Sequence, residues 1–103
     1  MKLIKQTSPT TCGQCCIAML LGIDEVDAIK MVGHSDITSD RSMVLILNNS
    51  FTMGEPPNDV LALVKHREPN GVREHWTVID HGKIFDPACH KKLWPAYKHL
   101  IIS

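Results

Sequence analysis

The first half of the chain carries the apolar spacing of helices. An almost continuous apolar run extends from Cys12 to Leu21, and a segment that is apolar all round predicts a helix buried at the centre of the fold. Thr11 stands where its side chain can cap the start of this helix. Gly22 stands where the helix should end.

Two further helices are expected before the midpoint of the chain. Asp24 and Gly33 delimit one of them over residues 25–32, and another is predicted to run from Asp40 to Asn48. The apolar residues of these segments are Val26, Ile29, Met31 and Val32, which should face the core, followed by Met43, Val44, Ile46 and Leu47.

The second half has the pattern of strands and turns. Two prolines make residues 53–57 a loop. The apolar run 60–64 predicts a buried strand, with a helical turn as the alternative, and a turn follows at 68–71. The tail 91–103 is either a short helix or a final strand packed over the core. Helices in one half and strands in the other predict an α+β fold.

Segments 75–80 and 83–86 are rich in β-forming residues and should pair as a hairpin through a two-residue loop. In that register Thr77 lies opposite Asp86, and His75 shares the face of Thr77 because it is two residues earlier. His75 and Asp86 are then diagonal neighbours, with backbone positions about 7–8 Å apart. Their side chains can join in a hydrogen bond, whereas a shift of one residue would separate them.

Composition limits the classes of function. The chain has 103 residues, 44% hydrophobic and 21% charged, which is typical of one globular domain spanning 1–103 without a separate cofactor domain. Eleven basic residues balance eleven acidic ones, so no net charge favours nucleic acid as a partner. We expect no cofactor.

Three of the four cysteines fall within five residues, whereas disulfide scaffolds spread their cysteines along the chain. We therefore expect free thiols and a reducing, cytoplasmic setting. Lys2 and Lys5 precede a polar segment instead of the apolar core of a signal peptide, and Ile17–Leu21 is too short to cross a bilayer. The sequence predicts no membrane segment in this chain.

Cys12 is the candidate nucleophile. The start of a helix concentrates unpaired N–H groups and partial positive charge, which favour a thiolate over a thiol. Gly13 should leave the approach to the Cys12 sulfur open. The alternative for a free cysteine is a small buried apolar residue, which suits Cys15 and Cys16 better because they lie inside the predicted helix.

A base, an orienting group and an oxyanion donor complete the candidate site. His75 would take the thiol proton, while Asp86 fixes the tautomer of its ring. Thioester chemistry passes through an oxyanion that needs preorganised donors. The candidate donors are the Cys12 backbone N–H and the side-chain amide of Gln6.

Three segments carry a resemblance to a known family: Gln6 to Leu20, His75 to Ile79 and Ile84 to Ala88. Together they resemble the peptidase C39-type branch of the papain-like cysteine proteases, which shows a Gln, five residues, Cys-Gly and an aliphatic helix, then a His before a hydrophobic strand, a turn and Asp-Pro. The roles that the resemblance implies are Gln6 as oxyanion-hole residue, Cys12 as nucleophile, His75 as base and Asp86 as orienting group.

The same resemblance implies a papain-like α+β fold, with N-terminal helices and the nucleophile helix packed on a small antiparallel sheet. It implies a peptide or protein substrate. Many relatives are joined to a membrane transporter and trim leader peptides after a Gly-Gly pair, so a transporter or carrier on another chain is a candidate partner. The chain departs from the family in having Thr11 where an acidic or amide residue is frequent, and in being short, which would reduce its substrate-binding loops.

Two other interpretations remain open. Cys12 and Cys15 form a C-x-x-C pair, and Cys89 with His90 offers further ligands, but zinc favours four ligands in tetrahedral geometry and a second well-spaced pair is missing, so we expect no metal. A papain-like domain with other acyl chemistry would use the same thioester as a deamidase, a transglutaminase or a toxin-like effector, the last being secreted. It would otherwise be a non-catalytic binding module.

The remaining histidines and the tryptophans are expected to have no catalytic role. The histidines that we place in loops or on polar faces, in contact with solvent, are His34, His66, His81, His90 and His99. Trp76 should pack in the core, and core packing is also the default for Trp94, with a place beside the cleft as the alternative.

Overall fold

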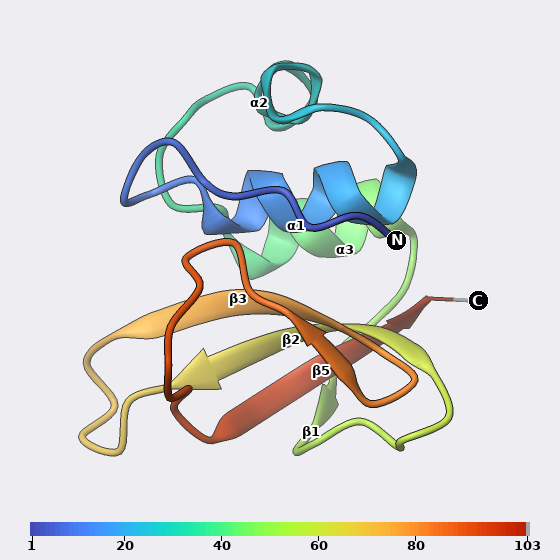
Figure 1. Ribbon diagram of the computed structural model, residues 1–103, viewed down its shortest axis with the longest axis vertical. Coiled ribbons are helices and arrows are strands. Elements are labelled where there is room, and N and C mark those ends of the chain that lie inside the picture. The colour runs from blue at the N-terminus through green and yellow to red at the C-terminus, as the bar shows by residue number, and fades with distance from the viewer. Residues whose placement is uncertain (103) are drawn as a thin grey trace.

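The structure is a computed structural model that describes residues 1–102. Within that range three helices precede five strands (Figure 1). The elements are α1 (Cys12–Leu21), α2 (Glu25–Val32), α3 (Asp40–Leu47), β1 (Thr52–Met53), β2 (Leu61–Arg67), β3 (Glu74–Asp80), β4 (Lys83–Phe85) and β5 (Ala96–Ile102). The strands form one antiparallel sheet in the order β1-β5-β2-β3-β4, which confirms the predicted α+β class.

The helices form layers on one side of the sheet. In Figure 1, α1 and α3 lie next to the sheet and α2 lies on the far side of α1. Helix α1 packs on both α2 and β3, and its first eight residues are all buried. This sandwiched position explains why its sequence is apolar all round. Among residues 1–102, no helix has both the length and the apolar character needed to cross a bilayer.

The predicted helix ends are confirmed except at one cap. Gly22 and Gly33 end α1 and α2 in left-handed conformations, with φ of 69° and 97°, which glycine adopts without steric cost. The Asp24 side chain accepts a hydrogen bond from the backbone N–H of Asp27 and so caps α2. Thr11 occupies the N-cap position of α1, but its hydroxyl donates to the Ser8 carbonyl and does not cap the helix.

Helix α2 is rotated relative to the prediction. Val26 and Met31 are 59% and 50% exposed, so their expected inward orientation is wrong. The buried residues are Ala28, which allows close approach to α1, and Glu25. The Glu25 carboxylate accepts hydrogen bonds from the backbone N–H and the hydroxyl of Thr7, at 3.4 and 3.2 Å. A buried carboxylate must be satisfied in this way, and the pattern of apolar residues alone did not reveal it.

The sheet differs from the prediction at its margins. The buried strand predicted at 60–64 is present as β2 but continues to Arg67. Of the two alternatives for the tail, the structure has the strand, because β5 lies between β1 and β2 and pairs with both. Strand β1 includes Met53, which had been placed in a loop. Its two residues take strand geometry by pairing with Lys98 and His99, far along the chain.

Gly13 lies at a tightly packed position of α1. A Cβ at this position would lie 2.6 Å from the Thr38 Oγ1 atom and 2.7 Å from its Cβ. The Thr38 backbone carbonyl in turn accepts a hydrogen bond from the indole N–H of Trp76 at 3.2 Å. Helix α1, the loop before α3 and strand β3 therefore meet at one tightly packed point.

Substitution of Gly13 by Ala tests this packing. Helix propensity alone would raise the free energy of unfolding by about 1 kcal/mol. Overlap with Thr38 should instead lower it by about 1–3 kcal/mol, the usual cost of overpacking. Urea unfolding of Gly13→Ala beside the parent protein gives the sign. A stability that stays equal or rises would contradict the packing argument.

Candidate active site

The Cys12 thiol lies at the first residue of α1, as predicted, and is buried. The four cysteines of the described chain are all free. Cys15 and Cys16 are completely buried one turn further along. Burial, together with the nearby Glu25 carboxylate, raises the pKa of Cys15 to about 12, and burial raises the pKa of Cys16 well above its ordinary value. Of the clustered thiols, Cys12 alone lies at the helix start.

His75 and Asp86 meet through the hairpin that the sequence predicts. The loop residues His81 and Gly82 have φ of 51° and 87°, the left-handed pair that makes a tight hairpin turn. Their strands pair Asp80 with Lys83. This register leaves His75 near the start of β3 and Asp86 just beyond β4 on the same face. The His75 Nε2 atom lies 2.6 Å from Asp86 Oδ1, so the predicted hydrogen bond is present.

Asp86 is the most heavily hydrogen-bonded carboxylate of the site. Oδ1 also accepts the backbone N–H of Ala88 at 2.9 Å, and Oδ2 accepts the backbone N–H of His90 at 2.9 Å and lies 3.1 Å from His90 Nδ1. Burial opposes ionisation, but the bonds from His75, Ala88 and His90 outweigh it and hold the pKa of Asp86 well below its ordinary value. Asp86 is therefore an anion held inside the protein.

The electrostatic partner of this anion is the His75 imidazole. Burial favours neutral His75, but the hydrogen bond to Asp86 and the adjacent Cys12 thiol together raise the pKa of His75 to about 9. Because Nε2 is engaged with Asp86, Nδ1 is the ring nitrogen left for the thiol. Cys12 and Asp86 are therefore both neighbours of the His75 ring, and Asp86 occupies its Nε2 side.

Gln6 is held beside this group by its backbone. Its N–H donates to the Pro87 carbonyl at 3.0 Å, which ties the segment before α1 to the loop that follows Asp86. The side-chain Nε2 donates to the Ser8 carbonyl at 2.9 Å and carries a second hydrogen. Oε1 is buried without a hydrogen-bond partner in the described chain. Gln6 lines the same cavity as His75.

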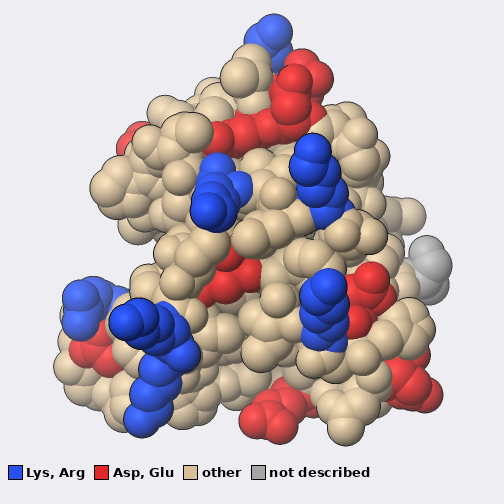
Figure 2. Space-filling view, in the orientation of Figure 1, with Lys and Arg blue, Asp and Glu red and all other residues tan. Residues whose placement is uncertain are grey.

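That cavity, of about 500 Å³, forms an open cleft beside His75. Pro9 and Ile37 line it from the loops of the helical layer, and Val72 and Trp94 line it from loops that connect the strands. Ile37 and Val72 are 72% and 76% exposed, which is unusual for large apolar side chains and typical of binding surfaces when they are clustered. Figure 2 shows the molecule hollowed between the helical layer and the sheet, on the side where the 68–73 turn lies.

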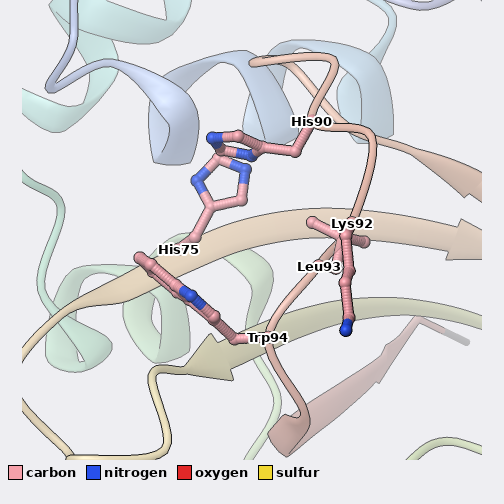
Figure 3. Close-up of a pocket in the computed structure, with 5 residues that line it drawn as sticks. All are labelled: His75, His90, Lys92, Leu93 and Trp94. Atoms are coloured by element: carbon pink, nitrogen blue, oxygen red, sulfur yellow. The ribbon is translucent and has the colours of Figure 1, made fainter.

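Of the histidines that the sequence places in contact with solvent, two are buried and a third contacts His75 and Asp86. His66 and His99 are each 4% exposed, so their placement on polar faces is wrong. The Nδ1 atom of His99 lies 2.8 Å from the Gly54 carbonyl. His90 keeps a partly exposed side chain but contacts both Asp86 and the ring of His75, with ring centroids 4.7 Å apart (Figure 3).

His66 fixes one wall of the cleft. Its Nδ1 lies 2.9 Å from the Trp94 carbonyl and its Nε2 lies 2.7 Å from the Thr77 hydroxyl. Burial is the main cause that lowers the pKa of His66, so the ring is neutral and can join both partners. Trp94 flanks the cleft, which is the alternative and not the core position expected by default. Trp76 is buried in the core, as predicted.

The zinc ligands considered from the sequence do not assemble. Within residues 1–102, the cluster of three or more potential ligand residues is His75, Asp86 and His90. Cys15 is buried inside α1, whereas Cys89 is exposed. His90 was missed as part of the site because its sequence signal is weak: it stands four residues after Asp86, across an irregular loop.

Comparisons of the chain with protein-family models, with curated proteins and with solved structures found no match.

Substitution of Asp86 by Asn tests the origin of the His75 titration. The folded pKa of about 9 lies above the ordinary value of 6.5. The stabilisation from protonated His75 is therefore complete below about pH 6.5 and is lost as the pH rises through about 9. In Asp86→Asn, burial is opposed only by the Cys12 thiol, so the pKa of His75 should fall toward its ordinary value of 6.5, with a stability cost of roughly 1–3 kcal/mol at pH 6. Imidazole NMR titration and urea unfolding at pH 6 and 9 measure both effects.

The exposed pair of Asp80 and His81, also 2.6 Å apart, provides a matched control. Asp80→Asn should change stability by less than about 1 kcal/mol, because exposed ion pairs contribute little. Equal effects of the two substitutions, or an unchanged His75 titration in Asp86→Asn, would show that the buried pair has no special role.

Proposed function

We propose that this chain is a thiol-dependent hydrolase of the C39-like branch of papain-like cysteine peptidases, acting on peptide or amide bonds. The observation that carries the proposal is the His75–Asp86 hydrogen bond beside a thiol at a helix start. A surface His–Asp pair is common, but here both side chains are only 8% exposed, and the pKa of the imidazole responds to the Cys12 thiol.

The arrangement of the elements supports the papain-like assignment. The nucleophile begins a central helix, α1, that packs on β3 of an antiparallel sheet. The base stands near the start of β3, and the orienting carboxylate follows β4. This chain order, together with the Gln6 and Asp86-Pro87 motifs, is what the resemblance implies. The substrate of the family is carried over only as a class, namely a peptide or protein.

The proposed reaction begins with the thiolate of Cys12 and the imidazolium of His75. The sulfur attacks the substrate carbonyl carbon, and the His75 proton passes to the leaving amine, so that a thioester and a free amine form. Water then attacks the thioester as His75 takes its proton. The products are a carboxylic acid and the restored thiol. Throughout, Asp86 keeps Nε2 occupied and Nδ1 directed to the reacting atoms.

The oxyanion of each tetrahedral intermediate needs two donors. The backbone N–H of Cys12 is one, because a residue at the start of a helix has no acceptor within the helix. The second hydrogen on Gln6 Nε2 is the other, and the Gln6–Pro87 backbone bond holds that side chain beside the cleft. Such donors contribute about 10²–10³ in turnover.

The cleft accommodates an extended segment of chain or an amide side chain. Its charged residues are already paired, since Arg73 contacts Glu68 at 2.5 Å and Glu74 contacts Arg67 at 2.9 Å. Apolar contacts with Ile37 and Val72 are therefore the main attraction available to a substrate.

A reactive free thiol needs a reducing setting, which makes the cytoplasm the proposed compartment. A transporter or carrier on another chain is a proposed partner.

Thiol alkylation tests the nucleophile. In a Cys89→Ser background, an alkylating agent near neutral pH should modify Cys12 before Cys15 and Cys16, whose raised pKa values keep them protonated. His75→Ala should slow modification of Cys12 by at least about tenfold, because the thiolate loses its counterion. Peptide mapping by mass spectrometry measures the rates, and His81→Ala is the control on an exposed histidine. Equal labelling of the three thiols would refute the assignment.

A peptide library identifies the reaction. Wild type should cleave some peptides, whereas Cys12→Ala should leave the library unchanged, since no thioester can form. Deamidation of glutamine would appear instead as an increase of about one mass unit, and transfer to an amine as loss of ammonia, because all three reactions share the thioester. No change with wild type would favour a binding module.

The active library peptide then tests Gln6. Gln6→Ala should lower kcat by about 10²–10³, while the alkylation rate of Cys12 stays within about twofold because the thiol and base are intact. Loss of both activities together would mean that Gln6 supports the fold and not the oxyanion.

A further inference from the structure

We propose that His75, Asp86 and His90 form a binding site for a zinc-class divalent metal ion, and that the bound ion prevents His75 from acting as a base. The first part is independent of the catalytic role of Cys12. The second part rests on the function proposed above. His90 is the residue that turns a two-membered hydrogen-bonded pair into a three-membered set of metal ligands.

The geometry brings the three potential ligand atoms close together. All lie within 4.8 Å of one another, and Asp86 already joins the two imidazoles, through Oδ1 to His75 and through Oδ2 to His90. Ligands about 2.0–2.2 Å from a tetrahedral zinc ion are separated by about 3.3 Å. To bring the ligand atoms from separations of up to 4.8 Å to this distance, His90 must rotate. Its side chain is 48% exposed and free to move on its solvent side.

A pocket of about 100 Å³ gives an ion access to the two imidazoles, and Asp86 and His90 line a neighbouring cavity. It is lined by His75, His90, Lys92, Leu93 and Trp94, and Figure 3 shows the two imidazoles next to one another at one end. Lys92 also lines the pocket, but its ammonium end points away from the rings in Figure 3. Leu93 and Trp94 supply an apolar flank, and such a shell strengthens the interaction between an ion and its ligands.

The ligand types favour zinc over magnesium or calcium. Two imidazole nitrogens and one carboxylate oxygen form a set that binds zinc in proteins, with a water molecule as the fourth ligand. Magnesium and calcium prefer sets composed entirely of oxygen. The backbone N–H groups of Ala88 and His90 also donate to Asp86, and so hold the carboxylate in place while an ion replaces its side-chain partners.

Metal binding changes the protonation of His75. The ion would replace the proton on Nε2, which passes to solvent, and the neutral ring would keep its remaining proton on Nδ1. A ring with metal at one nitrogen and a proton at the other has no lone pair to accept a proton from sulfur or water. Hydrolysis of the thioester, in which His75 takes a proton from water, would therefore stop while the ion is bound.

Zinc titration of the full chain tests the site directly. Isothermal calorimetry with zinc chloride should show one equivalent bound, and magnesium chloride should show none. In parallel NMR spectra, zinc should shift the imidazole resonances of His75 and His90 and leave those of the exposed His81 unchanged. This wild-type measurement requires no variant to fold.

Matched variants separate this site from binding to thiols. His90→Ala should weaken zinc binding by at least about tenfold, since loss of even an outer partner of a metal site costs about 10- to 100-fold. Cys89→Ser should retain the affinity of wild type within about twofold, and Cys12→Ala should not weaken binding. Loss of binding in either cysteine variant with retention in His90→Ala, or no binding by wild type, would overturn the site.

A separate measurement tests the link to catalysis. With a peptide that wild type hydrolyses, saturating zinc should abolish turnover and a chelator should restore it. If turnover stays unchanged with zinc bound at full occupancy, the ion does not prevent His75 from acting as a base, and this part of the proposal is wrong. Failure of the chain to hydrolyse any peptide would count against the proposed function alone, because the binding measurements do not depend on it.

Discussion

The site depends on the hydrogen bonds and the charge pairing of the buried Asp86 carboxylate. An anion taken out of water is costly unless each oxygen is hydrogen-bonded and a cation lies close by. Here Ala88 and His90 supply backbone N–H groups and His75 supplies a charged partner. These bonds fix the path of the chain after β4 and the orientation of the base at once. The bonds of Asp86 therefore determine both the local fold around this carboxylate and the chemistry of His75.

The remaining elements hold the nucleophile beside His75 and Asp86. Helix α1 has little freedom to move, because α2 covers one side, the sheet covers the other, and Gly13 packs against Thr38 without space for a methyl group. The segment before α1 is tied by Gln6 to the Pro87 carbonyl and by Thr7 to the buried Glu25. Cys12 is therefore fixed from both directions along the chain. Preorganisation of this kind lowers the cost of bringing reacting groups together.

Local patterns in the sequence predict some features of the fold and the site and miss others. The ends of α1 and the His75–Asp86 bond depend on near neighbours and on one tight turn, so they could be predicted. His66 lies in contact with Trp94, which is distant in sequence, and periodicity does not report such partners. Just before His90, which contacts Asp86, Cys89 adopts a left-handed conformation with φ of 54°. Few non-glycine residues do so, and no residue pattern announces it.

Asp86 faces two imidazoles, and the division of its oxygens between them determines what His75 can do. Oδ1 serves His75 and Ala88, whereas Oδ2 serves both the backbone and the ring of His90. A cation between the rings replaces the two side-chain bonds, while both backbone bonds can persist. The loop after Asp86 then need not unfold for the exchange, which requires only changes in ring orientation. The same anion can orient a base or ligate a metal, but His75 Nε2 cannot serve both at the same time.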